Sequence, residues 1–178
     1  MARKYDVIDS DGHVLEPLDL WEKYMDPGFR EGAPKLITDQ DGLQRLLIAG
    51  QVLGSSKGMG VVGAIGSRDG KVDEGEMSYE DGRPGGFDPH ARIPDMDLDG
   101  IDAAFLYPSI GLFAGAYKEP KLAAAVCRAY NRWLADYCKP YPDRLFGVAM
   151  LPMQSGYEQT CAGTENESHQ DENCTSCK

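Results

Sequence analysis

The chain has 178 residues and a formal net charge of −11, with 42 % hydrophobic and 26 % charged residues. This composition is ordinary for a globular domain, although the chain is short for a large α/β barrel. The negative charge argues against nucleic acid or an anionic membrane as the main partner, because neither gains from meeting acidic groups. An anionic substrate would therefore need a local positive centre, such as a metal ion.

The sequence carries no signal for a membrane or for secretion. No apolar run approaches the roughly 20 residues that a membrane span requires, and no apolar stretch of signal-peptide length follows the basic residues at the start. The five cysteines are an odd number, which favours reduced thiols over a disulfide framework. These features predict a cytoplasmic protein.

The first elements are a strand and a short helix. Residues 5–11 are predicted to form a strand that ends in acidic residues, after which Gly12 is expected to let the backbone turn tightly before His13. Residues 16–25 are predicted to form a helix with proline in its first turn. Three of its residues at helical spacing are expected to face inward, namely Leu18, Trp21 and Met25.

Residues 28–89 have a different texture and read as an excursion from the main fold. Apolar runs at 36–38 and 46–49 flank a turn sequence and predict a β-hairpin. Residues 54–86 are rich in glycine and charge, which is typical of a long loop or lid.

Beyond His90 the chain becomes regular. The patterns predict a helix, a strand, a long helix and a second strand over residues 93–100, 101–108, 120–139 and 145–152. A strand, a helix and a strand at this spacing indicate a right-handed parallel βαβ unit. Residues 155–178 are polar with almost no large apolar side chains, and are predicted to be disordered.

Asp11 and His13, at the end of the first predicted strand, are the candidate metal ligands. Residues two apart on an extended chain point to the same side, so a carboxylate oxygen and an imidazole nitrogen can reach one divalent cation. Active sites of (β/α) barrels lie at this end of the strands. The alternative is a capping or turn aspartate beside a surface histidine.

Several separate segments resemble the amidohydrolase-related family, which includes aminocarboxymuconate-semialdehyde decarboxylase and several aromatic-acid decarboxylases. That family opens with Ile-Asp-x-His-x-His, or with an acidic residue in place of the first histidine, and these two ligand positions fall on Asp11 and His13. The resemblance covers nearly all of residues 5–154 outside the excursion. It is carried by residues 7–17, 92–102, 106–109, 129–134 and 142–147.

The resemblance implies a distorted (β/α)8, TIM-like barrel with one divalent metal ion, zinc in the first place and manganese as the other option. The predicted fold is α/β, an incomplete barrel of about three strands with a β-hairpin and loop insertion. The predicted organisation is a barrel part at 1–154 with the insertion at about 28–89, followed by a polar tail at 155–178. The change of texture after Gln154 suggests a truncated ending.

The family's further ligands, histidines from middle strands and a late aspartate, have no evident counterparts. His90 and His169 stand in contexts that do not match them. The predicted function is the metal-dependent decarboxylation of a small carboxylic acid, with hydrolysis as the sister chemistry. The predicted partner is this small-molecule substrate, with a homo-oligomer as a further option. The alternative is an inactive fragment or pseudoenzyme that acts, if at all, through protein assembly. Catalytic residues beyond the ligands are not identified.

Smaller signals have structural alternatives. Tyr107 ends a predicted strand and either faces the site or packs. Arg92 is expected to serve helix geometry and solvation, and Arg132 is expected to form a structural ion pair and not to bind substrate. Four residues of the tail could hold zinc, but no apolar side chains surround them to build a site: Cys161, His169, Cys174 and Cys177.

Overall fold

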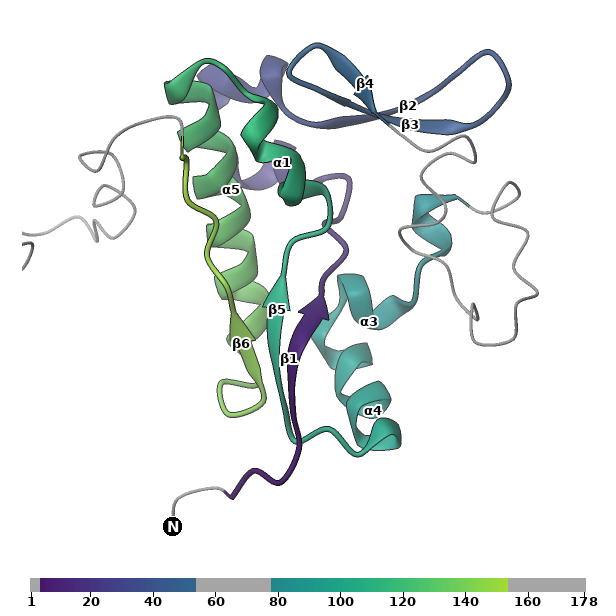
Figure 1. Ribbon diagram of the computed structural model, residues 1–178, viewed down its shortest axis with the longest axis vertical. Coiled ribbons are helices and arrows are strands. Elements are labelled where there is room, and N and C mark those ends of the chain that lie inside the picture. The colour runs from purple at the N-terminus through teal and green to yellow at the C-terminus, as the bar shows by residue number, and fades with distance from the viewer. Residues whose placement is uncertain (1–3, 54–77, 154–178) are drawn as a thin grey trace, which may run out of the picture.

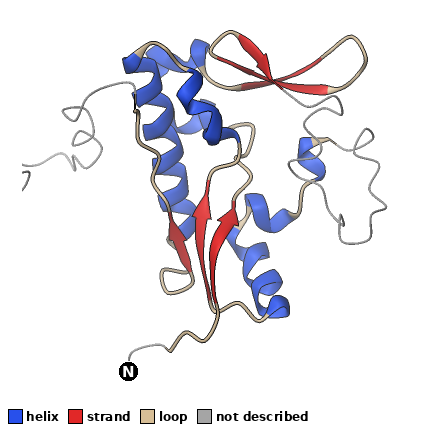
Figure 2. Cartoon of the chain, viewed as in Figure 1, coloured by secondary structure: helices blue, strands red, loops and turns tan. Residues whose placement is uncertain are grey.

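A computed structural model describes residues 4–53 and 78–153 of the chain (Figures 1 and 2). Most of the predicted lid and the whole predicted tail lie outside these residues. Short 3-10 helices occupy Pro27–Gly32, Tyr79–Asp81 and Ile110–Ala116. The strands and α-helices, in chain order, are β1 Ile8–His13, α1 Leu20–Tyr24, β2 Lys35–Thr38, β3 Gln44–Ile48, β4 Gln51–Leu53, α3 Pro84–Phe87, α4 Pro89–Asp99, β5 Ala103–Tyr107, α5 Pro120–Cys138 and β6 Leu145–Gly147.

The central sheet has three strands in the order β1-β5-β6, and both pairs are parallel. Ile8 lies opposite Ala103, and Ala104 lies opposite Leu145. Helix α5 runs behind β5 and β6 in the view of Figure 1. Within the described residues the sheet is open, so the fold is a partial barrel-like α/β arrangement and not a closed barrel. The prediction of three parallel strands is confirmed.

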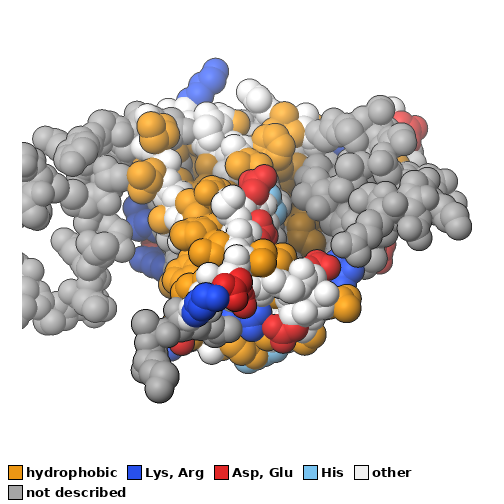
Figure 3. Space-filling view, turned by 60° about the horizontal axis from the view of Figure 1, so that its bottom comes forward, with side chains coloured by type: hydrophobic (Ala, Val, Ile, Leu, Met, Phe, Trp, Pro, Cys, Tyr) orange, Lys and Arg blue, Asp and Glu red, His pale blue; other side chains and the backbone are white. Residues whose placement is uncertain are grey.

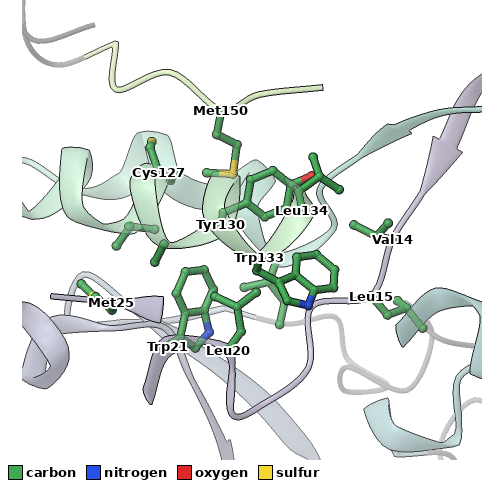
Figure 4. Close-up of a cluster of buried hydrophobic side chains, with 14 of the residues drawn as sticks. Val14, Leu15, Leu20, Trp21, Met25, Cys127, Tyr130, Trp133, Leu134 and Met150 are labelled. Carbon is green, nitrogen blue, oxygen red and sulfur yellow. The ribbon is translucent and has the colours of Figure 1, made fainter. Parts of the chain in front are cut away.

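Helix α5 supplies most of the core. The Glu119 carboxylate caps its start by accepting hydrogen bonds from the Lys121 and Leu122 amides, at 3.0 and 2.5 Å. Pro120 fits the first position because its missing N–H would have no partner there. The buried face packs against α1 and the segment after β1, as the sticks from α5 in Figure 4 show. Each large side chain buried in this way contributes about 1.5–3 kcal/mol. The helix was predicted almost to its ends.

Two helices differ from their predictions at the start. Helix α4 begins at Pro89 because Asp88 caps it, accepting from the His90 amide at 2.9 Å. It ends as predicted at Gly100, whose φ of 71° requires a residue without a Cβ. Helix α1 covers Leu20–Tyr24 only, so residues 16–19 precede it and the predicted proline in its first turn is wrong.

The predicted inward face of α1 is partly wrong. Trp21 and Met25 are buried, but Leu18 precedes the helix and is 45 % exposed. Because it is not helical, the three- and four-residue spacing does not apply to it.

Strand β6 is shorter than predicted, ending at Gly147. Past that point the Val148 amide still donates to the Leu106 carbonyl of β5 at 2.9 Å. The Asn131 side chain then holds Met150: its Oδ1 accepts from the Met150 amide at 2.8 Å and its Nδ2 donates to the Met150 carbonyl at 3.0 Å. A long apolar run can therefore be anchored without continuing as a strand, since its polar backbone groups find side-chain partners.

The excursion contains the predicted hairpin. Strands β2 and β3 pair antiparallel with Thr38 opposite Gln44, and β4 extends the sheet on β3. Leu46 and Ile48 of β3 are buried. This small sheet is separate from the parallel one.

One face of the parallel sheet leaves apolar side chains in contact with solvent. Phe105 of β5 and Phe146 of β6 stack with ring centroids 5.5 Å apart, and Phe105 is 41 % exposed. Figure 3 shows hydrophobic side chains at the surface among acidic and basic ones. In a parallel sheet both faces are normally covered.

None of the described helices is long and apolar enough to cross a membrane.

Candidate functional site

The end of β1 differs from the predicted turn. The strand continues through Gly12 to His13, pairing with Leu106 and Tyr107 of β5, with a register shift between Asp9 and Gly12. Gly12 has no positive φ, so it is not there to turn the chain. A Cβ on Gly12 would lie 2.8 Å from Asp9 Oδ2 and 3.0 Å from the Phe105 carbonyl oxygen. Glycine is needed because β1 approaches β5 closely at this irregularity.

Asp11 and His13 project to one side of the strand end. Asp11 Oδ1 and His13 Nε2 are 3.9 Å apart, and the side chains are 90 % and 40 % exposed. The Asp11 amide donates to Asp9 Oδ1 at 3.0 Å, so the carboxylate of Asp9 is turned back onto the backbone of the bulge. The predicted juxtaposition of one carboxylate and one imidazole is present.

The second nitrogen of His13 is committed to the backbone. Nδ1 lies 2.8 Å from the carbonyl oxygen of Pro108, the residue after β5. A carbonyl oxygen only accepts hydrogen bonds, so Nδ1 must carry the proton. Nε2 is then the ring nitrogen that faces Asp11, 3.9 Å from its Oδ1. The Tyr107 ring lies beside the imidazole, with centroids 6.0 Å apart and planes at 39°.

Arg92 of α4 supports the site from behind, a role that sequence reasoning missed. Its guanidinium donates to the His13 carbonyl, to the Gly85 carbonyl at 3.0 Å and to the Tyr137 hydroxyl at 3.1 Å. The charge is thus used to join α4, α3 and α5 to the end of β1. The Tyr137 hydroxyl donates in turn to the Gly85 carbonyl at 2.5 Å.

Glu16 is the second residue whose role was missed. Its side chain is fully buried, and three backbone amides at the start of the 3-10 helix Ile110–Ala116 donate to its carboxylate. The distances are 3.1 Å from Ser109, 3.0 Å from Ile110 and 2.9 Å from Gly111. An acidic residue inside an apolar run was the only signal in the sequence, and it does not identify the donors.

Burial raises the pKa of the Glu16 carboxyl, and the backbone N–H groups oppose the rise. Tyr79 also donates to it across 3.5 Å, and burial together with the glutamate charge raises the pKa of that phenol. The Tyr130 hydroxyl is buried and has no hydrogen-bond partner among the described residues. Burial raises the pKa of Tyr130 as well.

The donor set at the end of β1 fits a divalent metal ion. Two ligands of a tetrahedral zinc ion, each about 2.1 Å from it, lie about 3.4 Å apart, close to the observed separation. A carboxylate and an imidazole whose other nitrogen binds a carbonyl are an ordinary first pair of ligands. Within residues 4–53 and 78–153 no group of three or more histidine, cysteine or acidic side chains gathers around one point. The remaining ligands are therefore not supplied by this part of the chain.

The other predicted residues lie elsewhere. His90 lies in the first turn of α4, and its Nδ1 is 2.8 Å from the Tyr141 hydroxyl. Arg132 donates to Asp26 at 2.9 Å, which confirms its structural role. Cys127 and Cys138 are free thiols whose pKa values burial raises to about 11. The four candidate zinc ligands of the tail lie outside the described residues.

A family profile and a solved structure of an amidohydrolase are both similar to this chain. The profile of the amidohydrolase family matches residues 8–162. The crystal structure of amidohydrolase map2389c from Mycobacterium avium subsp. paratuberculosis K-10 is similar, with a TM-score of 0.59 and 23 % sequence identity, covering 83 % of this chain and 43 % of that chain. The likeness shows a shared fold, and the chain spans less than half of that relative. No curated protein matches the chain.

Proposed function

The chain belongs to the amidohydrolase family, and we propose that Asp11 and His13 are two of the protein ligands of one divalent cation, zinc or alternatively manganese. Family membership supports an enzyme of the hydrolase or lyase type. The observation that carries the proposal is the 3.9 Å separation of Asp11 Oδ1 and His13 Nε2 at the carboxyl end of β1. Barrel enzymes place their chemistry at this end of the strands.

We propose that the reaction is the decarboxylation of a small carboxylic acid. Support comes from the resemblance of five separate segments, in order, to the decarboxylase-like branch. The net charge of −11 adds that a carboxylate substrate needs a positive centre in an otherwise negative protein. When bound, the cation supplies a Lewis acid that stabilises negative charge on a coordinated oxygen.

In this scheme the chain's own residues hold the cation and orient the substrate. Asp11 contributes an oxygen ligand and negative charge, and His13 contributes a nitrogen ligand whose direction is set by the Pro108 carbonyl. Tyr107, beside the His13 ring, forms one wall against which an aromatic acid can lie. Arg92 is occupied by backbone carbonyls and fixes the strand end rather than binding substrate.

The reaction is tested with carboxyl-labelled dihydroxybenzoic acids and, in parallel, with 4-nitrophenyl esters, each with zinc or manganese added. The expected result is labelled carbon dioxide released only with metal, lost in His13→Ala and kept in the matched variant His90→Ala. Metal-dependent ester cleavage without release of carbon dioxide would show that the protein is a hydrolase and not a decarboxylase.

A second candidate is a catalytically inactive chain that acts through assembly. The observation favouring it is that the described residues bring no third ligand to Asp11 and His13. If the folded chain turns over neither probe when metal is added, the result would support this candidate over the enzyme.

A further inference from the structure

The Glu16 carboxylate binds the turn that follows β5, and the same turn contacts His13. The carboxylate is held by the amides of Ser109, Ile110 and Gly111, with Oε1 facing Ser109 and Gly111 and Oε2 facing Ile110. A fully buried carboxylate with three such donors has little freedom to move. The turn after β5 is therefore fixed to the residue three positions after His13.

The last residue of β5 and the turn after it make three further contacts with His13 and Val14. The Val14 amide donates to the Tyr107 carbonyl at 3.0 Å. The Ser109 hydroxyl donates to the Val14 carbonyl at 2.8 Å. Between them, His13 Nδ1 meets the Pro108 carbonyl at 2.8 Å. The carbonyl that selects the tautomer of His13 thus immediately precedes the first amide that Glu16 binds.

We propose that Glu16 is a positioning residue: it holds the Pro108–Gly111 turn so that the Pro108 carbonyl keeps the proton of His13 on Nδ1 and leaves Nε2 to bind a cation. The cation rests on the proposed function, whereas the choice of tautomer is a property of the chain alone. The hydrogen bonds run from the Glu16 carboxylate through the backbone of Ser109 to Pro108 and then to the imidazole. Groups of this kind behind a metal-bound histidine typically change metal affinity by 10–100-fold when altered.

A merely structural role for Glu16 makes a different prediction. A buried carboxylate that only stabilises the fold would leave the imidazole tautomer unchanged in any variant that still folds. The tautomer therefore separates the two roles.

The test is long-range ¹H–¹⁵N NMR of the metal-free full chain, at a pH of about 8 where imidazoles are neutral. In the wild type the expected signals of His13 are those of a protonated Nδ1 and a bare Nε2. In Glu16→Gln the amide NH₂ must face a backbone N–H, so the turn shifts and the ring populates the Nε2–H form. The matched variant Glu119→Gln, which alters the cap of α5, is expected to leave His13 as in the wild type.

Zinc titration of the same three proteins provides the second readout, with a loss of affinity of about 10–100-fold in Glu16→Gln alone. A folded Glu16→Gln chain with an unchanged tautomer would overturn the proposal, as would a wild-type His13 protonated on Nε2. If Glu16→Gln does not fold, Glu16→Asp, which keeps the charge but withdraws it by one methylene, is judged by the same criteria. A tautomer that depends on Glu16 in a chain without zinc affinity would contradict the proposed function and leave this inference intact.

Discussion

Replacing Glu16 with alanine is expected to lower the free energy of unfolding by about 3–5 kcal/mol. The substitution leaves the amides of Ser109, Ile110 and Gly111 without their acceptor. These donors lie around a fully buried side chain, so water cannot readily replace the lost partner. Urea denaturation followed by far-UV circular dichroism measures the change.

The matched control is Glu119→Ala. Glu119 also accepts two backbone amides, but at the exposed start of α5, where water can take its place. Loss of such a cap costs about 0.5–2 kcal/mol. Equal losses in the two variants would mean that the burial of Glu16 adds nothing, and would contradict the role assigned to it.

Gly12→Ala is expected to destabilise the chain by about 1–3 kcal/mol and to weaken metal binding at the same time. The added methyl meets Asp9 Oδ2 at 2.8 Å and the Phe105 carbonyl at 3.0 Å, and the backbone oxygen cannot rotate away. Strand β1 must then move from β5, which carries His13 away from the Pro108 carbonyl and displaces Asp11 with it. Denaturation and zinc titration of the same variant measure the two effects.

Gly28→Ala is the control for this substitution. Gly28 has no atom within 4 Å of an added Cβ and no positive φ, so the change is expected to stay within about 0.5 kcal/mol. Zinc affinity is expected to match the wild type. A Gly12→Ala chain as stable as Gly28→Ala would show that β1 and β5 are not packed as closely as described.

Local patterns predicted the elements whose signals are strong and close together in sequence. The stripe of α5, the glycine after α4 and the hairpin of β2 and β3 were all recognised, because periodicity and turn residues are short-range properties. The ends of β1 and β6 were not. Their lengths depend on pairing with β5, which a single strand does not reveal.

The proximity of the two candidate ligands was predictable from the sequence, and their role as ligands stays a prediction. Asp11 and His13 follow from a two-residue spacing, and the structure brings them together. The partners of His13 could not be read in the same way, because Pro108 is 95 residues away and offers only a backbone carbonyl. Arg92 lay within a recognised segment, yet its acceptors come from three other elements. Tertiary contacts of this kind leave no local pattern.

Asp11 and His13 are proposed to bind one divalent cation. Elemental analysis of the purified chain after exposure to zinc and removal of loosely bound metal tests it most directly, alongside Asp11→Ala/His13→Ala and the control His90→Ala. Near-stoichiometric zinc in the wild type and in His90→Ala, with none in the double variant, is the predicted result. Equal zinc in the wild type and the double variant, or none in any of the three, would contradict the claim.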